Sequence, residues 1–173
     1  MKLKTIFKYL KAKAKGTLKC AVDDGMKVGK NVTVMSGVNF GSEPYLITLG
    51  DKVRISSDVI FVTHDGGTWA FRNKYEEYKD VSKFGKIEVG EETFIGCKSV
   101  IMPGVKIGKN CVIGAGSIVT KDVPDETVVC GVPAKKVCTI LEYAQRCKEQ
   151  MPEAFKTEKY NGNKKEYIMK IFE

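Results

Sequence analysis

An aliphatic residue recurs at every sixth position of this chain, and no other feature of the sequence constrains the fold as strongly. The unbroken series comprises Val89, Ile95, Ile101, Ile107, Ile113 and Val119. Glycine follows the aliphatic residue in four of these repeats, and a small or β-branched residue stands four positions after it in all of them. A period of six matches neither a helix nor a single strand, so it predicts short strands joined by tight corners.

Three such repeats can close one triangular coil. Stacked coils would bury the aliphatic positions in a continuous interior column and would pair their backbones with the coils above and below. The corners need small side chains or a positive φ, which the recurrent Gly, Asn and Asp residues supply. The predicted fold class is therefore all-β, a parallel β-helix of hexapeptide repeats.

Two segments interrupt the period. The pattern of residues 28–41 shifts its register near Ser42–Thr48 and resumes at Leu49. The second interruption, residues 64–86, contains the only histidine and the only tryptophan of the chain. Because 28 positions, not a multiple of six, separate Phe61 from Val89, we predict that residues 64–86 form an ordered loop ejected from a corner.

The length of 173 residues predicts a single domain. Residues 26–136 form the β-helix in this prediction, and residues 137–173 form a helical extension. Helical spacing of apolar residues predicts an amphipathic basic helix within residues 1–20 and another helix over residues 136–150. Such helices would cover the open ends of the stack.

The net charge of +8 is concentrated at the amino end. Residues 1–20 carry seven lysines and no acid, so the remaining residues carry only +1. A nearly neutral body argues against nucleic acid as a partner. The basic helix either makes a peripheral contact with a membrane surface or caps the stack with a solvated lysine face. Lysines interrupt every apolar group near the amino end, so we expect no secretory signal and a cytoplasmic protein.

Residues 113–136, IGAGSIVTKDVPDETVVCGVPAKK, resemble the closing coils of the maltose, galactoside and serine acetyltransferases. The THDGG stretch at residues 63–67 resembles the capsule and exopolysaccharide acetyltransferases. The resemblance implies a left-handed β-helix and a homotrimer with active sites between subunits. It also implies O-acetylation of a saccharide hydroxyl by acetyl-CoA, the acceptor being a capsule, exopolysaccharide or lipopolysaccharide precursor.

The same resemblance implies roles for single residues. His64 would be the general base, and the residues implied to bind coenzyme A are Cys97, Lys98, Ala115, Thr120, Lys121 and Lys135. The chain departs from the sugar acetyltransferases at VMSG, where Met35 or Ser36 stands in place of an acceptor-binding Asn, and at Phe94, which replaces a tryptophan. The identity of the sugar therefore does not carry over.

The residues support this chemistry independently. Transfer of an acyl group from a thioester to a hydroxyl needs a base that is active near neutral pH, and His64 is the sole histidine. Either Asp65 or a backbone carbonyl would orient its ring. The candidate substrate-binding residues are Asp65, Trp69, Phe71, Arg72, Met35 and Ser36.

Several alternatives remain at this stage. The aromatic residues of the loop either stack on a sugar or pack the loop onto a neighbour. A single histidine cannot form the three-histidine zinc site of a hydratase, so no metal is expected. The acceptor could instead be the nitrogen of an amino sugar, or a drug such as a streptogramin or chloramphenicol. A catalytically inactive scaffold is the remaining alternative.

Overall fold

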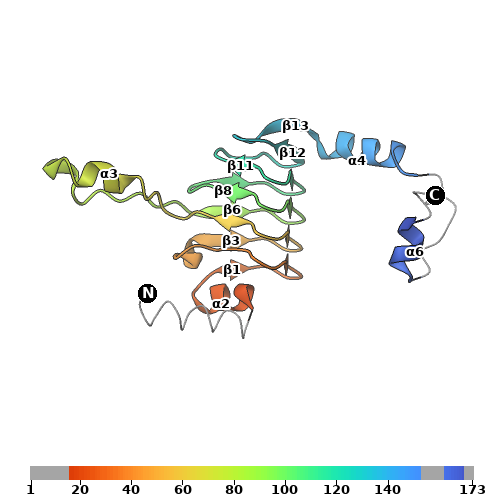
Figure 1. Ribbon diagram of the computed structural model, residues 1–173, viewed down its shortest axis with the longest axis horizontal. Coiled ribbons are helices and arrows are strands. Elements are labelled where there is room, and N and C mark those ends of the chain that lie inside the picture. The colour runs from red at the N-terminus through yellow and green to blue at the C-terminus, as the bar shows by residue number, and fades with distance from the viewer. Residues whose placement is uncertain (1–15, 153–161, 170–173) are drawn as a thin grey trace. The chain divides into compact units, whose positions relative to one another are not determined.

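The structure, a computed structural model, describes residues 16–152 and 162–169. The chain divides into two compact units, Met1–Ile140 and Leu141–Glu173. The first unit is a stack of coils whose strands form three sheets (Figure 1). It is a left-handed parallel β-helix, which confirms the predicted fold class.

Each sheet forms one face of the prism. The first face consists of β1 (Lys27–Val28), β3 (Ile47–Leu49), β6 (Ile87–Val89) and β9 (Lys106–Ile107). The second consists of β2 (Thr33–Val34), β4 (Arg54–Ile55), β7 (Phe94–Ile95), β10 (Val112–Ile113), β12 (Thr127–Cys130) and β13 (Lys135–Thr139). The third consists of β5 (Ile60–Phe61), β8 (Val100–Ile101) and β11 (Ile118–Val119). All pairings are parallel except that of β12 with β13.

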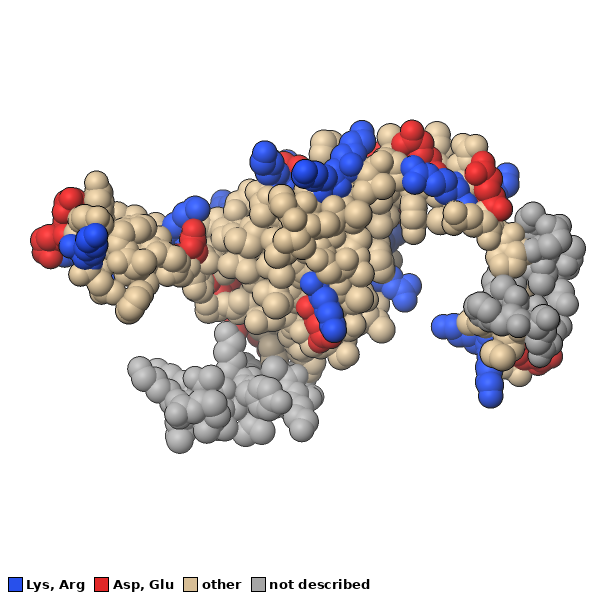
Figure 2. Space-filling view, turned by 45° about the horizontal axis from the view of Figure 1, so that its top comes forward, with Lys and Arg blue, Asp and Glu red and all other residues tan. Residues whose placement is uncertain are grey.

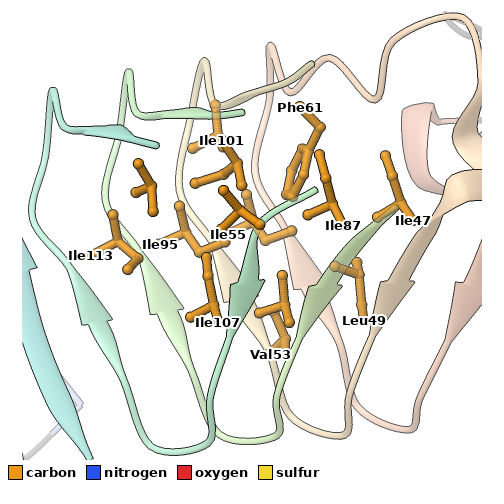
Figure 3. Close-up of a cluster of buried hydrophobic side chains, with 14 of the residues drawn as sticks. Ile47, Leu49, Val53, Ile55, Phe61, Ile87, Ile95, Ile101, Ile107 and Ile113 are labelled. Carbon is orange, nitrogen blue, oxygen red and sulfur yellow. The ribbon is translucent and has the colours of Figure 1, made fainter. Parts of the chain in front are cut away.

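The interior is the column that the repeat predicted (Figure 3). All six aliphatic residues of the unbroken series are buried, with at most 3% of their surface exposed. The small residues that stand four positions later are also buried, and Thr93 Oγ1 donates to the carbonyl of Gly108 at 2.9 Å. Each coil therefore supplies apolar side chains to the interior column and side-chain hydrogen bonds to the next coil.

The inserted residues of both interruptions project from the same corner of the prism. In regular coils, paired residues lie 18 positions apart, as Val89 and Ile107 do. The sequence separation of paired residues rises to 21 positions between Val28 and Leu49, and to 40 positions between Leu49 and Val89. The extra residues follow Phe40 and Phe61, whose rings stack at 5.3 Å in neighbouring coils. The first insertion contains η1 (Pro44–Leu46), and the second contains α3 (Thr68–Arg72) and η2 (Glu76–Tyr78).

The two ends of the stack are covered differently. At the amino end, α2 (Thr17–Asp23) buries Ala21 against the core, as a capping helix should. Residues 1–15 of the predicted basic helix lie outside the described residues. No helix in the described part of the chain is long and apolar enough to span a membrane.

The helix predicted over residues 136–150 begins later than expected. Residues 135–139 form β13, which pairs antiparallel with β12, and α4 runs from Ile140 to Glu149. The backbone groups at the edge of β12 need hydrogen-bonding partners, and this requirement outweighs the helical propensity of residues 136–139. The strand also buries Cys138. Strand β13 therefore covers the edge of this sheet, although the sequence predicted that a helix would do so. A further helix, α6, spans Lys164–Met169.

Replacement of Ile107 tests the interior column. Ile107→Ala should lower the free energy of unfolding by about 2–5 kcal/mol, because it opens a cavity between close-packed coils. Lys106→Ala, in the same strand with its side chain outward, is the matched control and should cost less than about 1 kcal/mol. Urea denaturation measures both, and equal losses would contradict the packing described.

Candidate active site

Two corners lie at opposite ends of the strands in the β5–β8–β11 sheet. The Lys98 corner precedes the strands of this sheet and consists of Ser36–Gly37, Ser57–Asp58, Cys97–Lys98 and Ala115–Gly116. Hydrogen bonds connect these segments from one coil to the next; for example, Lys98 N–H donates to Ser57 O at 3.0 Å. The His64 corner follows the strands and contains both insertions. Its segments are 41–46, 62–86, 102–104 and 120–122.

A short antiparallel ribbon places His64 at its corner. Residues 63–65 pair with residues 83–85 through Asp65 N–H to Lys83 O and Gly85 N–H to Thr63 O, both at 2.9 Å. Gly85 lies so close to the next coil that a Cβ would stand 2.2 Å from the Gly104 nitrogen. The base of the insertion is therefore fixed against the prism, and His64 with it. We call the part beyond this ribbon, residues 66–82, the arm.

Glu43, from the first insertion, is the partner of His64. One carboxylate oxygen, Oε2, lies 2.9 Å from His64 Nδ1 and accepts the Thr63 hydroxyl at 2.5 Å. The Glu43 side chain is 15% exposed, whereas the His64 side chain is 46% exposed. The carboxylate is thus held beneath an imidazole that solvent and ligands can reach.

The electrostatics determine the tautomer of His64. Burial alone raises the pKa of Glu43, but hydrogen bonds from Thr63, His64 and Ser42 outweigh it, and the net shift is downward. An ionised carboxylate can only accept, so Nδ1 must carry the proton. The lone pair then lies on Nε2, which is the arrangement that a general base requires.

Asp65 does not orient the histidine. It accepts from Gly67 N–H at 2.9 Å and from Lys83 Nζ at 3.2 Å. The hydrogen bond from Gly67 N–H, followed by that from Lys83, lowers the pKa of Asp65. Neighbouring side chains on a strand point to opposite faces, which explains why residue 65 cannot reach the ring of residue 64.

The arm is ordered and projects beyond the coils, with charged side chains of both signs at its far end (Figure 2). The rings of Phe71 and Tyr78 meet edge to face at 6.1 Å, and Arg72 Nε donates to the Lys79 carbonyl at 2.8 Å. Phe71 therefore packs inside the arm. Trp69, in contrast, is 72% exposed.

A hollow of about 400 Å³ lies where the arm meets the ribbon. His64, Trp69, Arg72, Lys83 and Phe84 line it, and the Phe84 ring lies 6.0 Å from the imidazole. Sites for small ligands combine aromatic walls with a few polar groups in this way. Three of the predicted substrate-binding residues, Asp65, Trp69 and Arg72, line this hollow.

The other predicted residues are divided between the two corners. Cys97, Lys98 and Ala115 lie at the Lys98 corner, as does Ser36, and Met35 directly precedes it. Thr120 and Lys121 lie at the His64 corner, above the histidine, and Lys135 begins β13. One chain alone therefore does not bring these residues together around His64.

Sequence reasoning missed Glu43, although a signal for it existed. Phe40 and Phe61 occupy equivalent positions in successive coils, so the residues that follow them share a corner. Counting the repeat across the first interruption would have placed Glu43 close to His64. Within residues 16–152 and 162–169, no group of three or more His, Cys, Asp or Glu residues could hold a metal ion.

Comparisons with known proteins agree with this architecture. Residues 86–121 match the family model described as bacterial transferase hexapeptide (six repeats). The chain is 47% identical to Protein CapG of Staphylococcus aureus over 86% of its own length and 84% of that protein. It is 42% identical to the galactoside O-acetyltransferase of Escherichia coli over 55% of this chain and 45% of that enzyme.

A similar solved structure is that of a hexapeptide-repeat-containing acetyltransferase, VCA0836, from Vibrio cholerae in complex with acetyl coenzyme A. The TM-score is 0.58 at 28% identity, covering 66% of this chain and 60% of that chain.

The tautomer of His64 can be measured directly, because the chain has one histidine. In protein labelled with ¹⁵N-histidine, above the pH at which the ring loses its charge, we expect a protonated Nδ1 and an unprotonated Nε2. Glu43→Ala should remove this preference, whereas Glu88→Ala, on an exposed strand position, should not. A proton on Nε2 in the unsubstituted protein would contradict the pairing.

Proposed function

The chain belongs to the hexapeptide-repeat acetyltransferases, and from this we propose that it transfers acetyl from acetyl-CoA to a saccharide hydroxyl, with His64 as general base. The observation that carries the proposal is the Glu43–His64 pair beside an aromatic hollow. Similarity to a galactoside O-acetyltransferase supports a saccharide acceptor. The THDGG resemblance supports a precursor of a capsule, exopolysaccharide or lipopolysaccharide.

In the proposed reaction, Nε2 of His64 takes the proton of the acceptor hydroxyl as its oxygen attacks the thioester carbonyl carbon. The carbon–sulfur bond then breaks, and the imidazolium returns the proton to the departing thiolate. Glu43 holds Nδ1–H throughout and stabilises the positive charge that the ring acquires. The two proton transfers need only His64 and Glu43, together with the two substrates.

The coenzyme would bind through groups on both corners. Lys121 and Lys135 are exposed cations suited to its phosphates. The backbone at Lys98 would lie beside the thioester arm, and Ala115 leaves room for the pantetheine chain. Cys97 and Thr120 flank these positions along the chain. These assignments follow the resemblance of this chain to the hexapeptide-repeat acetyltransferases.

The separation of the two corners supports active sites between subunits. His64 and the Lys98 corner lie at opposite ends of the strands of one sheet, β5–β8–β11. The outward side chains of this sheet are aliphatic, namely Ile60, Val100 and Ile118, and Ile60 is 41% exposed. We propose that this face turns toward a threefold axis, so that the His64 corner of each subunit meets the Lys98 corner of the next.

Replacement of His64 tests the chemistry. With acetyl-CoA and a panel of saccharides, amino sugars and acetylated drugs, His64→Ala should lower kcat by at least about 100-fold, because the base is lost. Release of the CoA thiol measures the rate, and a circular dichroism spectrum checks the fold. Unchanged turnover would remove His64 from the mechanism, and turnover on drugs alone would overturn the saccharide assignment.

Mixed trimers test the shared site. His64→Ala and Ala115→Trp should each be inactive, the second because the indole blocks the coenzyme. Subunits of the two variants, unfolded and refolded together in equal amounts, should regain about a quarter of normal activity, since a complete site then forms between unlike neighbours. Refolding each variant alone is the control. No recovery in mixed trimers would contradict inter-subunit sites.

A further inference from the structure

The charges around the hollow beside His64 are unbalanced. Two cations, Arg72 and Lys83, line it together with a single carboxylate, that of Asp65. Asp65 is already engaged by Gly67 N–H and by Lys83 Nζ. In the part of the chain that the structure describes, no carboxylate lies within ion-pair distance of the Arg72 guanidinium. The lining of the hollow therefore carries an excess positive charge.

Arg72 is held in a geometry suited to binding an anion. Its Nε is fixed by the Lys79 carbonyl at 2.8 Å, and this bond leaves the terminal N–H groups of the guanidinium available. A guanidinium stays charged at any physiological pH and offers paired donors that match a carboxylate or phosphate. The bond to the backbone restricts the side chain, so less conformational entropy is lost when a ligand binds.

Lys83 can contribute to the same anion. Its ion pair with Asp65 spans 3.2 Å between side chains that are 67% and 42% exposed. Such exposed pairs contribute little free energy, so a ligand anion can share the lysine at small cost. The aromatic side chains of Trp69 and Phe84, 72% and 58% exposed, offer faces for the apolar side of a sugar ring.

We propose that the acceptor is an anionic saccharide, whose carboxylate or phosphate group binds to Arg72 and Lys83 while a hydroxyl lies at His64 Nε2. This inference rests on the proposed acetyl transfer and specifies its substrate class. The carboxylate would come from a uronic acid, and the phosphate from a sugar phosphate or a nucleotide sugar. The two sources share the chemistry that the hollow recognises, and matched acceptors distinguish them.

The test uses pairs of acceptors in which one member carries an anionic group and the other a neutral group at the same position. Methyl hexuronosides of the gluco, galacto and manno series are each compared with their uncharged methyl esters, and hexose 1-phosphates are compared with the methyl hexosides. The readout is the ratio of kcat/KM for the charged member to that for the neutral member. The unsubstituted protein should prefer the charged member by about 10- to 100-fold in one series, as expected for charge-assisted hydrogen bonds. The series that shows the preference identifies the anion.

Variants connect the preference to its residues. Arg72→Gln keeps a donor for the Lys79 carbonyl and should bring the ratio close to one, and Lys83→Gln should lower it several-fold. Asp65→Asn should raise it, because the competing carboxylate is lost. Lys74→Gln, which removes an exposed cation stacked on Tyr75 and outside the hollow, is the matched control and should leave the ratio unchanged.

Two results would overturn the inference without affecting the proposed function. One is acetyl transfer that uses neutral and charged acceptors equally, and the other is a charge preference that both Arg72→Gln and Lys83→Gln retain. Absence of acetyl transfer to every acceptor, with coenzyme A bound, would instead reject the proposed function, and this inference with it.

Discussion

The structure depends on the fixed circumference of the coil. Every repeat must place an aliphatic side chain in the interior column and pair its backbone with the coils above and below. Extra residues can therefore leave the prism only at a corner, where no interior position is displaced. Both insertions of this chain do so at the same corner of successive coils, because they follow the stacked rings of Phe40 and Phe61.

The chemistry of the candidate site follows from the position of both insertions at one corner. The first insertion supplies Glu43, the intact strand end supplies Thr63, and the second insertion begins with His64. Hydrogen bonds keep the carboxylate ionised, and the carboxylate in turn holds the proton on Nδ1. A rigid repeat thus brings together His64 and Glu43, which neither insertion could do by itself. The ribbon at residues 63–65 and 83–85 places this pair beside the hollow of the arm.

Much of this was predictable from sequence, for identifiable reasons. The period of six gave the fold, the interior residues and the corner from which residues 64–86 project, because each rests on local pattern. It did not reveal β13. This strand forms because the unpaired backbone groups of β12 need hydrogen-bonding partners, a tertiary effect that overrides the helical spacing of the apolar residues. Nor did it reveal Glu43, whose distance from His64 depends on counting the register through an irregular segment. The division of the predicted coenzyme residues between two corners also requires the folded chain.

A crystal structure with acetyl-CoA and the unsubstituted protein would test the central claim most directly. We expect a threefold assembly in which the thioester carbonyl lies within reach of His64 Nε2, Glu43 remains bound to Nδ1, and the pantetheine chain lies against the Lys98 corner of the neighbouring subunit. Coenzyme held by one chain alone, or a thioester remote from His64, would contradict the account.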